Sequence, residues 1–245
     1  GVIVLTPFLT LLLSYADIPT EHIVHVAIAT SMGTILFTSL SSVRAHASRG
    51  AVLWKEVAAI APGILLGGIL GAQITGYLST FWVALIFAGF VGYSATKMFF
   101  AKKVAASRGL PGTAGMVGAG TAIGTISALV GAGGGFISVP FLTYCNVPMH
   151  KAIGTSSALG FPIAFAGTIG YIVSGWAEPT LPGFPYTLGY IHLPALFSVA
   201  VMSIFTAPIG AKVAHSIDTK PLKRIFASIL YVLASYMLYR AVMAA

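Results

Sequence analysis

The chain has 245 residues, of which 57% are hydrophobic and only 7% charged, and its formal net charge is +8. Soluble domains carry about 25% charged residues, so the composition excludes a soluble enzyme, and the apolar content also excludes a disordered chain. The single cysteine, Cys145, excludes a disulfide framework and a cysteine-based metal site. A polytopic helical membrane protein remains.

The first apolar segment, 2–14, is too short to cross a bilayer, because a transmembrane helix needs about 20 apolar residues. We expect it to be the second leg of a hairpin whose N-terminal leg is missing from the sequence. A later apolar segment, 113–145, is long enough to cross but is interrupted by the glycine-rich stretch Gly131–Gly135. Runs of spanning length predict six transmembrane helices, at 26–43, 57–76, 81–99, 152–174, 190–209 and 224–243.

The chain contains an internal repeat. The segment 1–10 matches 135–143 once Thr6 is skipped, and 26–31 matches 151–156. Later in each half, Gly-Ala-Gln at 71–73 matches Gly-Ala-Lys at 210–212. We therefore divide the chain into a first repeat over 1–100, a basic cytoplasmic linker over 101–112 and a second repeat over 113–245.

The lysines and arginines indicate how the repeats are oriented, since these residues concentrate in cytoplasmic loops. If the glycine-rich break folds 113–145 back to its starting side, twelve of the thirteen lie inside and only Arg240 lies outside. The repeats are then inverted. The predicted fold is an all-α polytopic membrane protein with two inverted repeats, each a Gly-broken helical hairpin plus three transmembrane helices. Inverted repeats with broken helices are typical of alternating-access transporters, whose site lies at the breaks.

Three stretches resemble a known family. They are Gly-Ala-Gly-Gly-Gly-Phe-Ile-Ser-Val-Pro-Phe-Leu at 131–142, Lys-Ala-Ile-Gly-Thr-Ser-Ser at 151–157, and Pro62-Gly63 with Gly67, Gly68 and Gly71. Together they resemble the TauE/SafE sulfite exporter family, also called the toluene sulfonate uptake permease (TSUP) family. The resemblance covers nearly the whole chain and implies transport of small sulfur-containing anions such as sulfite or sulfonates. It does not identify the substrate.

Backbone amides and hydroxyls are the expected anion ligands. An interrupted helix inside a bilayer has to line a cavity or be enclosed by protein, and the free amides of the leg that starts near Phe136 favour an anion. Hydroxyls follow at matching places in both repeats. The candidate substrate-binding residues are Gly133, Gly134, Gly135, Phe136, Thr155, Ser156, Ser157, Thr30, Ser31 and Lys151. The alternative for the hydroxyls is that they bond backbone carbonyls and pack helices.

Other residues receive structural interpretations. Glycines at three- and four-residue spacing form a close-packing face; they are Gly63, Gly67 and Gly71 and, further on, Gly118, Gly120 and Gly124. Lys151 and Lys212 either attract an anion or act as ordinary cytoplasmic anchors. The six histidines show no metal-ligand spacing, so we predict no metal and no cofactor.

We therefore predict a secondary transporter, an exporter of sulfite or organosulfonates, in the cell (inner) membrane. A passive anion channel and a carrier of another small organic anion remain alternatives. An intramembrane enzyme is disfavoured because paired acid and base groups are missing. The expected partners are the sulfur oxyanion or sulfonate, membrane lipid, coupled protons and a second copy in a homo-oligomer. Nucleic acid is not expected, since the basic residues lie in short loops between spans.

Overall fold

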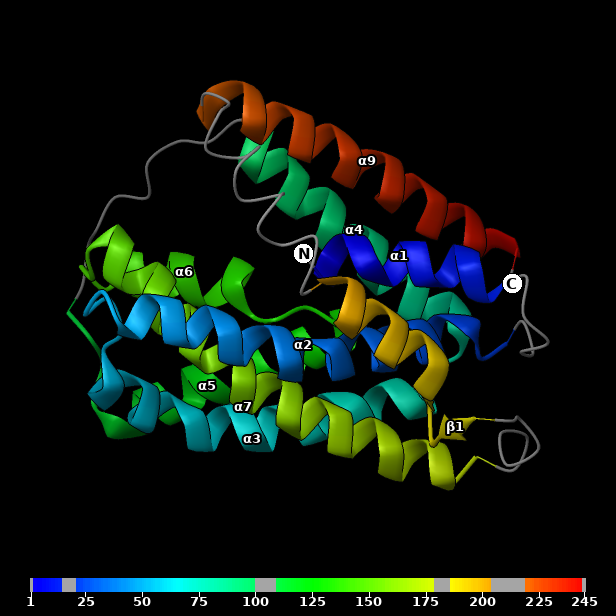
Figure 1. Cartoon of the computed structure of the whole chain (residues 1–245), viewed down its shortest axis with the longest axis horizontal. Helices are drawn as coiled ribbons and strands as arrows, with labels where there is room; N and C mark the ends of the chain where they lie inside the picture. The colour runs from blue at the N-terminus through cyan, green and yellow to red at the C-terminus, as the bar shows by residue number, and fades with distance from the viewer. Residues whose placement is uncertain (1, 15–20, 100–108, 179–185, 204–218, 244–245) are drawn as a thin grey trace.

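The structure is a computed structural model that describes residues 2–14, 21–99, 109–178, 186–203 and 219–243. The described part is a helical bundle (Figure 1). Its α-helices are α1 (Val2–Leu13), α2 (Ile23–Ala47), α3 (Trp54–Tyr77), α4 (Thr80–Phe99), α5 (Thr113–Val130), α6 (Gly135–Tyr144), α7 (Met149–Trp176), a helix over Leu193–Ser203, and α9 (Thr219–Met243).

Long apolar helices define the class of protein. Among the described residues, α2, α3, α5 and α7 are each long and apolar enough to cross a membrane. The prediction of an all-α polytopic membrane protein is thereby confirmed. The helix α5 belongs to this set because its 18 residues reach about 27 Å at ~1.5 Å per residue. The predicted spans 26–43, 57–76, 81–99, 152–174 and 224–243 lie within α2, α3, α4, α7 and α9.

The predicted span 190–209 differs from the structure at its start. A two-residue strand β2 (Ile191–His192) pairs antiparallel with β1 (Thr187–Leu188), and the helix begins only at Leu193. Hydrophobicity alone does not reveal this hairpin, because Tyr190 and Ile191 are buried like residues of a span. The remainder of the predicted span, 204–209, lies outside the described residues.

Glycines allow α3 to pack closely against α5 and α7. A Cβ at Gly63 or Gly67 would collide with the backbone of Val117 or Thr121 on α5, and one at Gly68 would lie 2.7 Å from the Cβ of Ala166 on α7. Chain positions increase together along both contacts, so α3, α5 and α7 run parallel. The close-packing face predicted from the glycine spacing is confirmed at five positions. The sixth, Gly118, has nothing within 4 Å of its Cβ position, so the prediction that it packs against another helix was wrong.

The helix α6 runs in the opposite direction to α5. Its C-terminal end is joined to the start of α7 by the short segment 145–148, and the Ser138 hydroxyl oxygen lies 2.6 Å from that of Ser156 on α7. It is therefore antiparallel to α7 and so to α5. Figure 1 shows the same course, with the chain crossing between α5 and α6 in an extended segment. The segment 113–145 thus turns back on itself at 131–134.

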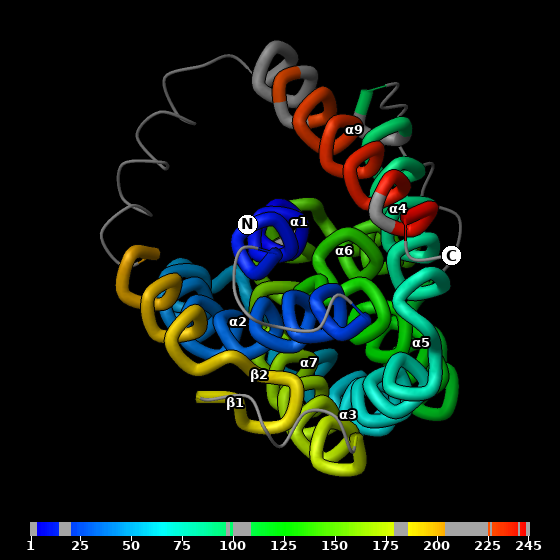
Figure 2. The backbone as a smooth tube through the Cα atoms, turned by 90° about the vertical axis from the view of Figure 1, so that its right-hand side faces the viewer, coloured from blue at the N-terminus to red at the C-terminus, as the bar shows by residue number. Residues whose placement is uncertain are grey.

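The centre of the bundle consists of α2 and α7 (Figure 2). They are antiparallel, because Gly167 faces Met32 while Gly160 faces Ser39. At one edge, α4 and α9 lie side by side in both views, joined by a hydrogen bond of 2.7 Å between Thr96 and Tyr231. Outward faces carry large exposed apolar side chains such as Leu66 and Leu70 on α3. A soluble monomer rarely exposes so much apolar surface.

Candidate functional site

Two glycines shape the break between α5 and α6. Gly131 follows the last residue of α5 with φ of 61°, and Gly134 precedes the first residue of α6 with φ of 72°. Residues with a Cβ rarely adopt this left-handed backbone conformation. The end of α5 is closed by hydrogen bonds from the Gly131 and Ala132 amides to the carbonyls of Ala128 and Ser127, in the manner of a helix C-cap. The break is therefore a defined turn built by its glycines.

The first turn of α6 is held by hydrogen bonds to the carbonyl of Gly134. The Gly134 carbonyl accepts hydrogen bonds from the amides of Ile137 and Ser138 and from the Ser138 hydroxyl. No side chain caps the start of the helix. The first amides of α6, at the positive end of the helix dipole, therefore receive no hydrogen bond from a side chain of the cap residue.

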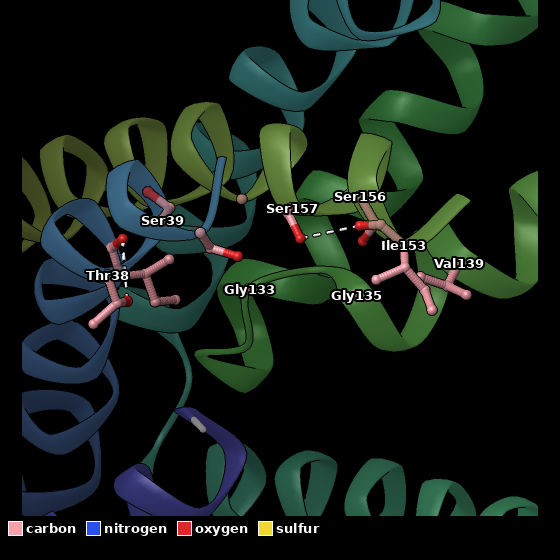
Figure 3. A pocket seen from close by; sticks show the side chains of 11 residues that line it. Thr38, Ser39, Gly133, Gly135, Val139, Ile153, Ser156 and Ser157 are labelled. Carbon is pink, nitrogen blue, oxygen red and sulfur yellow. Dashed lines mark hydrogen bonds between the residues drawn. The ribbon is translucent and has the colours of Figure 1, made fainter. Parts of the chain in front are cut away.

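A cavity of about 390 Å³ lies beside this turn (Figure 3). Its walls come from the second half of α2, from the break with α6, and from the first half of α7. The lining residues are Ile35, Thr38, Ser39, Ser42, Gly133, Gly135, Val139, Ile153, Ser156, Ser157 and Gly160. None of these eleven carries a charge, and five carry a hydroxyl group.

Most of these hydroxyls are held by their own helices. Ser157 donates to the carbonyl of Ile153 at 3.0 Å, and Ser39 donates to that of Leu36 at 3.3 Å. Ser156 instead shares a 2.6 Å hydrogen bond with Ser138 on α6. A hydroxyl that bonds a helix carbonyl can rotate its proton toward a ligand, and the exchange of one such bond for another costs little.

The predicted site residues separate into two groups. Gly133, Gly135, Ser156 and Ser157 come together at the cavity. Gly134, between Gly133 and Gly135 in the chain, is buried and does not line the cavity, and a Cβ there would collide with Ile163. Phe136 is partly exposed, and Lys151 is half-buried in the first turn of α7; neither lines the cavity. Lys212 lies outside the described residues.

The remaining predicted hydroxyls are buried and engaged elsewhere. Thr155 accepts a hydrogen bond of 3.0 Å from the amide of Leu53, just before α3. Thr30 accepts one of 3.0 Å from the amide of His192, just before the helix Leu193–Ser203. Ser31 accepts one of 3.0 Å from Thr6 on α1. These contacts match the alternative that small hydroxyls join helices.

Sequence reasoning missed the hydroxyls of α2. Thr38, Ser39 and Ser42 line the cavity, yet they lie two to three turns beyond Thr30 and Ser31 and outside the motif shared by the repeats. A signal was present: Thr34, Thr38 and Ser42 recur every four residues, which places them along one side of a helix. A polar stripe in an apolar span marks a face turned toward protein or a cavity.

Known proteins identify the family. The family model described as "Sulfite exporter TauE/SafE" matches residues 1–237. A probable membrane transporter protein of Haemophilus influenzae is 36% identical over 236 residues, covering 96% of this chain and 88% of that protein. One of Methanocaldococcus jannaschii is 25% identical over 242 residues, covering 97% and 87%. No solved structure gives a significant match.

The fold and these matches define a multi-pass membrane transporter rather than an enzyme. The chain belongs to the TauE/SafE sulfite exporter family. The resemblance seen in the glycine-rich motifs is thereby confirmed.

Proposed function

We propose that the protein is a secondary transporter that exports small sulfur-containing anions, such as sulfite or organosulfonates, by alternating access. The observation that carries the proposal is the uncharged cavity at the break between α5 and α6, lined by glycines and hydroxyls. Amides at the start of α6 and the hydroxyls of Ser156 and Ser157 are the proposed anion ligands. Such a neutral site can replace hydration without holding the anion too tightly for release.

Paired contacts support the inverted relation of the two halves. A short helix is tied to a long one by hydroxyls in each half, Thr6 to Ser31 and Ser138 to Ser156. Ser31 and Ser156 occupy matching places in the sequence repeat, and α2 and α7, which carry them, run antiparallel. Inverted repeats predict such opposite directions for equivalent helices.

A second pair of contacts crosses between the halves. Thr155 of the second half holds the amide that precedes α3, and Thr30 of the first half holds the amide that precedes Leu193–Ser203. Each half thus fixes the start of a helix in the other, and the proposed inverted repeat makes these two helices equivalent. Under this proposal, Ser31 is the counterpart of the cavity residue Ser156, and Thr30 and Ser31 approach the anion when the opposite end of the bundle opens.

The position of the cavity favours a carrier over a channel. It lies along α2 from Ile35 to Ser42, while the part of α2 before it, from Ile23 to Thr34, is buried throughout. A cavity that is closed at one end by packed side chains is the arrangement of one state of an alternating-access cycle. A passive channel is the competing function.

Transport by purified protein in liposomes tests the proposal. We expect saturable uptake of labelled sulfite or a small sulfonate and acceleration of efflux by unlabelled anion on the opposite side. A linear, unsaturated flux without this exchange would indicate a channel, and no flux of any sulfur anion would reject the proposed substrates. Lipid contact, coupling to protons, self-association and residence in the inner membrane stay predictions.

A further inference from the structure

A cluster of titratable side chains closes the end of the bundle opposite the cavity. His25 lies in the first turn of α2 and is only 3% exposed. It meets the last turn of α3, the first residue of α4, and Tyr190 from the turn between β1 and β2. In Figure 1 this end is marked by the strand label β1. The proposed anion site does not use any of these residues.

The hydrogen bonds of His25 define its protonation in this closed arrangement. Its Nε2 atom lies 3.0 Å from the carbonyl oxygens of both Thr75 and Leu78. A carbonyl only accepts hydrogen bonds, so Nε2 carries a proton and donates it. Nδ1 lies 3.5 Å from the Thr80 hydroxyl, which is itself bonded to the Glu21 carbonyl. Nδ1 is therefore the ring atom left to bind a second proton.

The surroundings of His25 oppose a charge while the cluster stays closed. Its own segment contributes Glu21 and His22, α7 contributes Tyr171, the segment just after α7 contributes Glu178, and the turn between the strands contributes Tyr190. Both carboxylates approach His22, at 3.6 and 4.0 Å, whereas the ring of His25 faces that of Tyr190 at 5.3 Å and that of His22 at 6.3 Å. Burial and the Glu178 carboxylate raise the pKa of Tyr190 to about 12, so this neighbour stays neutral.

Contacts in this cluster join the two halves of the chain. The His25 ring stacks on Tyr190, and His22 lies 4.0 Å from Glu178. Glycines permit the close fit, because a Cβ at Gly175 or Gly189 would collide with the facing backbone of the turn or of α7. Separation of α2 from α7 at this end would break these contacts and bring water to His25.

We propose that His25 is a proton-binding site that controls this end of the bundle: the neutral ring closes it, and a proton added at Nδ1 opens it. In the closed cluster, an imidazolium ion at His25 would lose its hydration and lie close to His22. In the open state, water solvates the same ion. Closure is therefore complete at high pH and is lost as the pH falls. The inference goes beyond the proposed function and rests on it only for its consequence, that acid on this side favours the state open to this side.

Labelling of a buried cysteine tests the proposal without any transported anion. Thr75→Cys is introduced with Cys145→Ser, which removes the one native cysteine; Thr75 is fully buried, and its carbonyl contact to His25 does not involve the side chain. The rate of maleimide labelling is divided by that of the exposed variant Ser48→Cys to cancel the pH dependence of the thiol. We expect the ratio to rise by up to about tenfold per pH unit as the pH falls from about 8 to about 5.

Matched histidine variants decide which group binds the proton. With His25→Gln the labelling ratio should lose its pH dependence, while His46→Gln, the same substitution near the other end of α2, should retain it. His22→Gln should also retain it. A pH response that survives His25→Gln, or that disappears with His22→Gln, overturns the proposal, as does a ratio that does not change with pH.

A second measurement covers the case in which His25→Gln fails to fold. With histidine ¹⁵N-labelled in the Thr75→Cys protein, one ring signal should titrate with the same midpoint as the labelling ratio. The absence of a shared midpoint contradicts the proposal. Because neither measurement uses an anion, a failure here leaves the transport proposal standing, and a failure of the liposome assay leaves this inference standing.

Discussion

The hydroxyl oxygens of Ser138 and Ser156 lie 2.6 Å apart and join α6 to α7 at the wall of the cavity. Ser138 also donates to the Gly134 carbonyl, so its proton is already committed and the proton between the two serines comes from Ser156. An arriving anion competes for this proton. Ser156 is consequently the side chain through which binding and the position of α6 are coupled.

Ser156→Ala tests this coupling. Loss of one neutral hydrogen bond to the ligand corresponds to about 1 kcal/mol, or about fivefold weaker binding. The dissociation constant for sulfite or a small sulfonate, measured by calorimetry, checks the value. Ser198→Ala is the matched control, because Ser198 is exposed and donates to the Pro194 carbonyl of its own helix. Equal affinity in both variants would remove Ser156 from the site.

Gly133→Leu should abolish transport without preventing membrane insertion. The Cβ position of Gly133 has only Ile35 nearby, at 3.7 Å, so a leucine fits sterically but extends into the cavity that Gly133 lines. Liposome flux and the amount of protein in the membrane are measured together. Gly118→Leu, at an exposed position with nothing within 4 Å, is expected to transport normally. Normal flux with Gly133→Leu would place the anion path elsewhere.

Gly134→Ala should destabilise the break. A left-handed backbone costs a residue with a Cβ roughly 1–2 kcal/mol, and at Gly134 that atom would also collide with Ile163. We expect a lower thermal unfolding midpoint in detergent. Gly133→Ala is the control, because its Cβ makes only ordinary contacts with Ile35. A similar midpoint for both variants would mean that the turn at Gly134 is not required for stability.

Much of the fold could be predicted from the sequence because helices in membranes depend on length and hydrophobicity. The runs that became α2, α3 and α7 are continuous and apolar, and the glycine-rich stretch at 131–135 marks where the helix ends. The hairpin of β1 and β2 could not be predicted, since Tyr190 and Ile191 are buried by α7 and α2 rather than by a helix of their own. Such burial depends on tertiary packing that no local pattern records.

The candidate site was predicted in part. Local motifs pointed to Gly133, Gly135, Ser156 and Ser157, which the structure brings together at the cavity. The same motifs pointed to Thr30 and Thr155, whose hydroxyls hold backbone amides from distant segments. A hydroxyl cannot be assigned to a ligand or to a backbone amide from its spacing alone, because either partner satisfies it equally well. Thr38, Ser39 and Ser42 line the cavity only because α2 packs against α7 of the other half. The repeated motifs do not predict that contact.

The position of a bound anion tests the central claim most directly. Selenite has the shape and charge of sulfite and scatters X-rays anomalously, so crystals grown with it locate the anion independently of the protein chain. We predict one anomalous peak in the cavity, within hydrogen-bonding distance of the amides of Gly135 or Phe136 and of the Ser156 or Ser157 hydroxyl. A peak at the basic segments 97–108 or 212–224, with the cavity empty, would contradict the account.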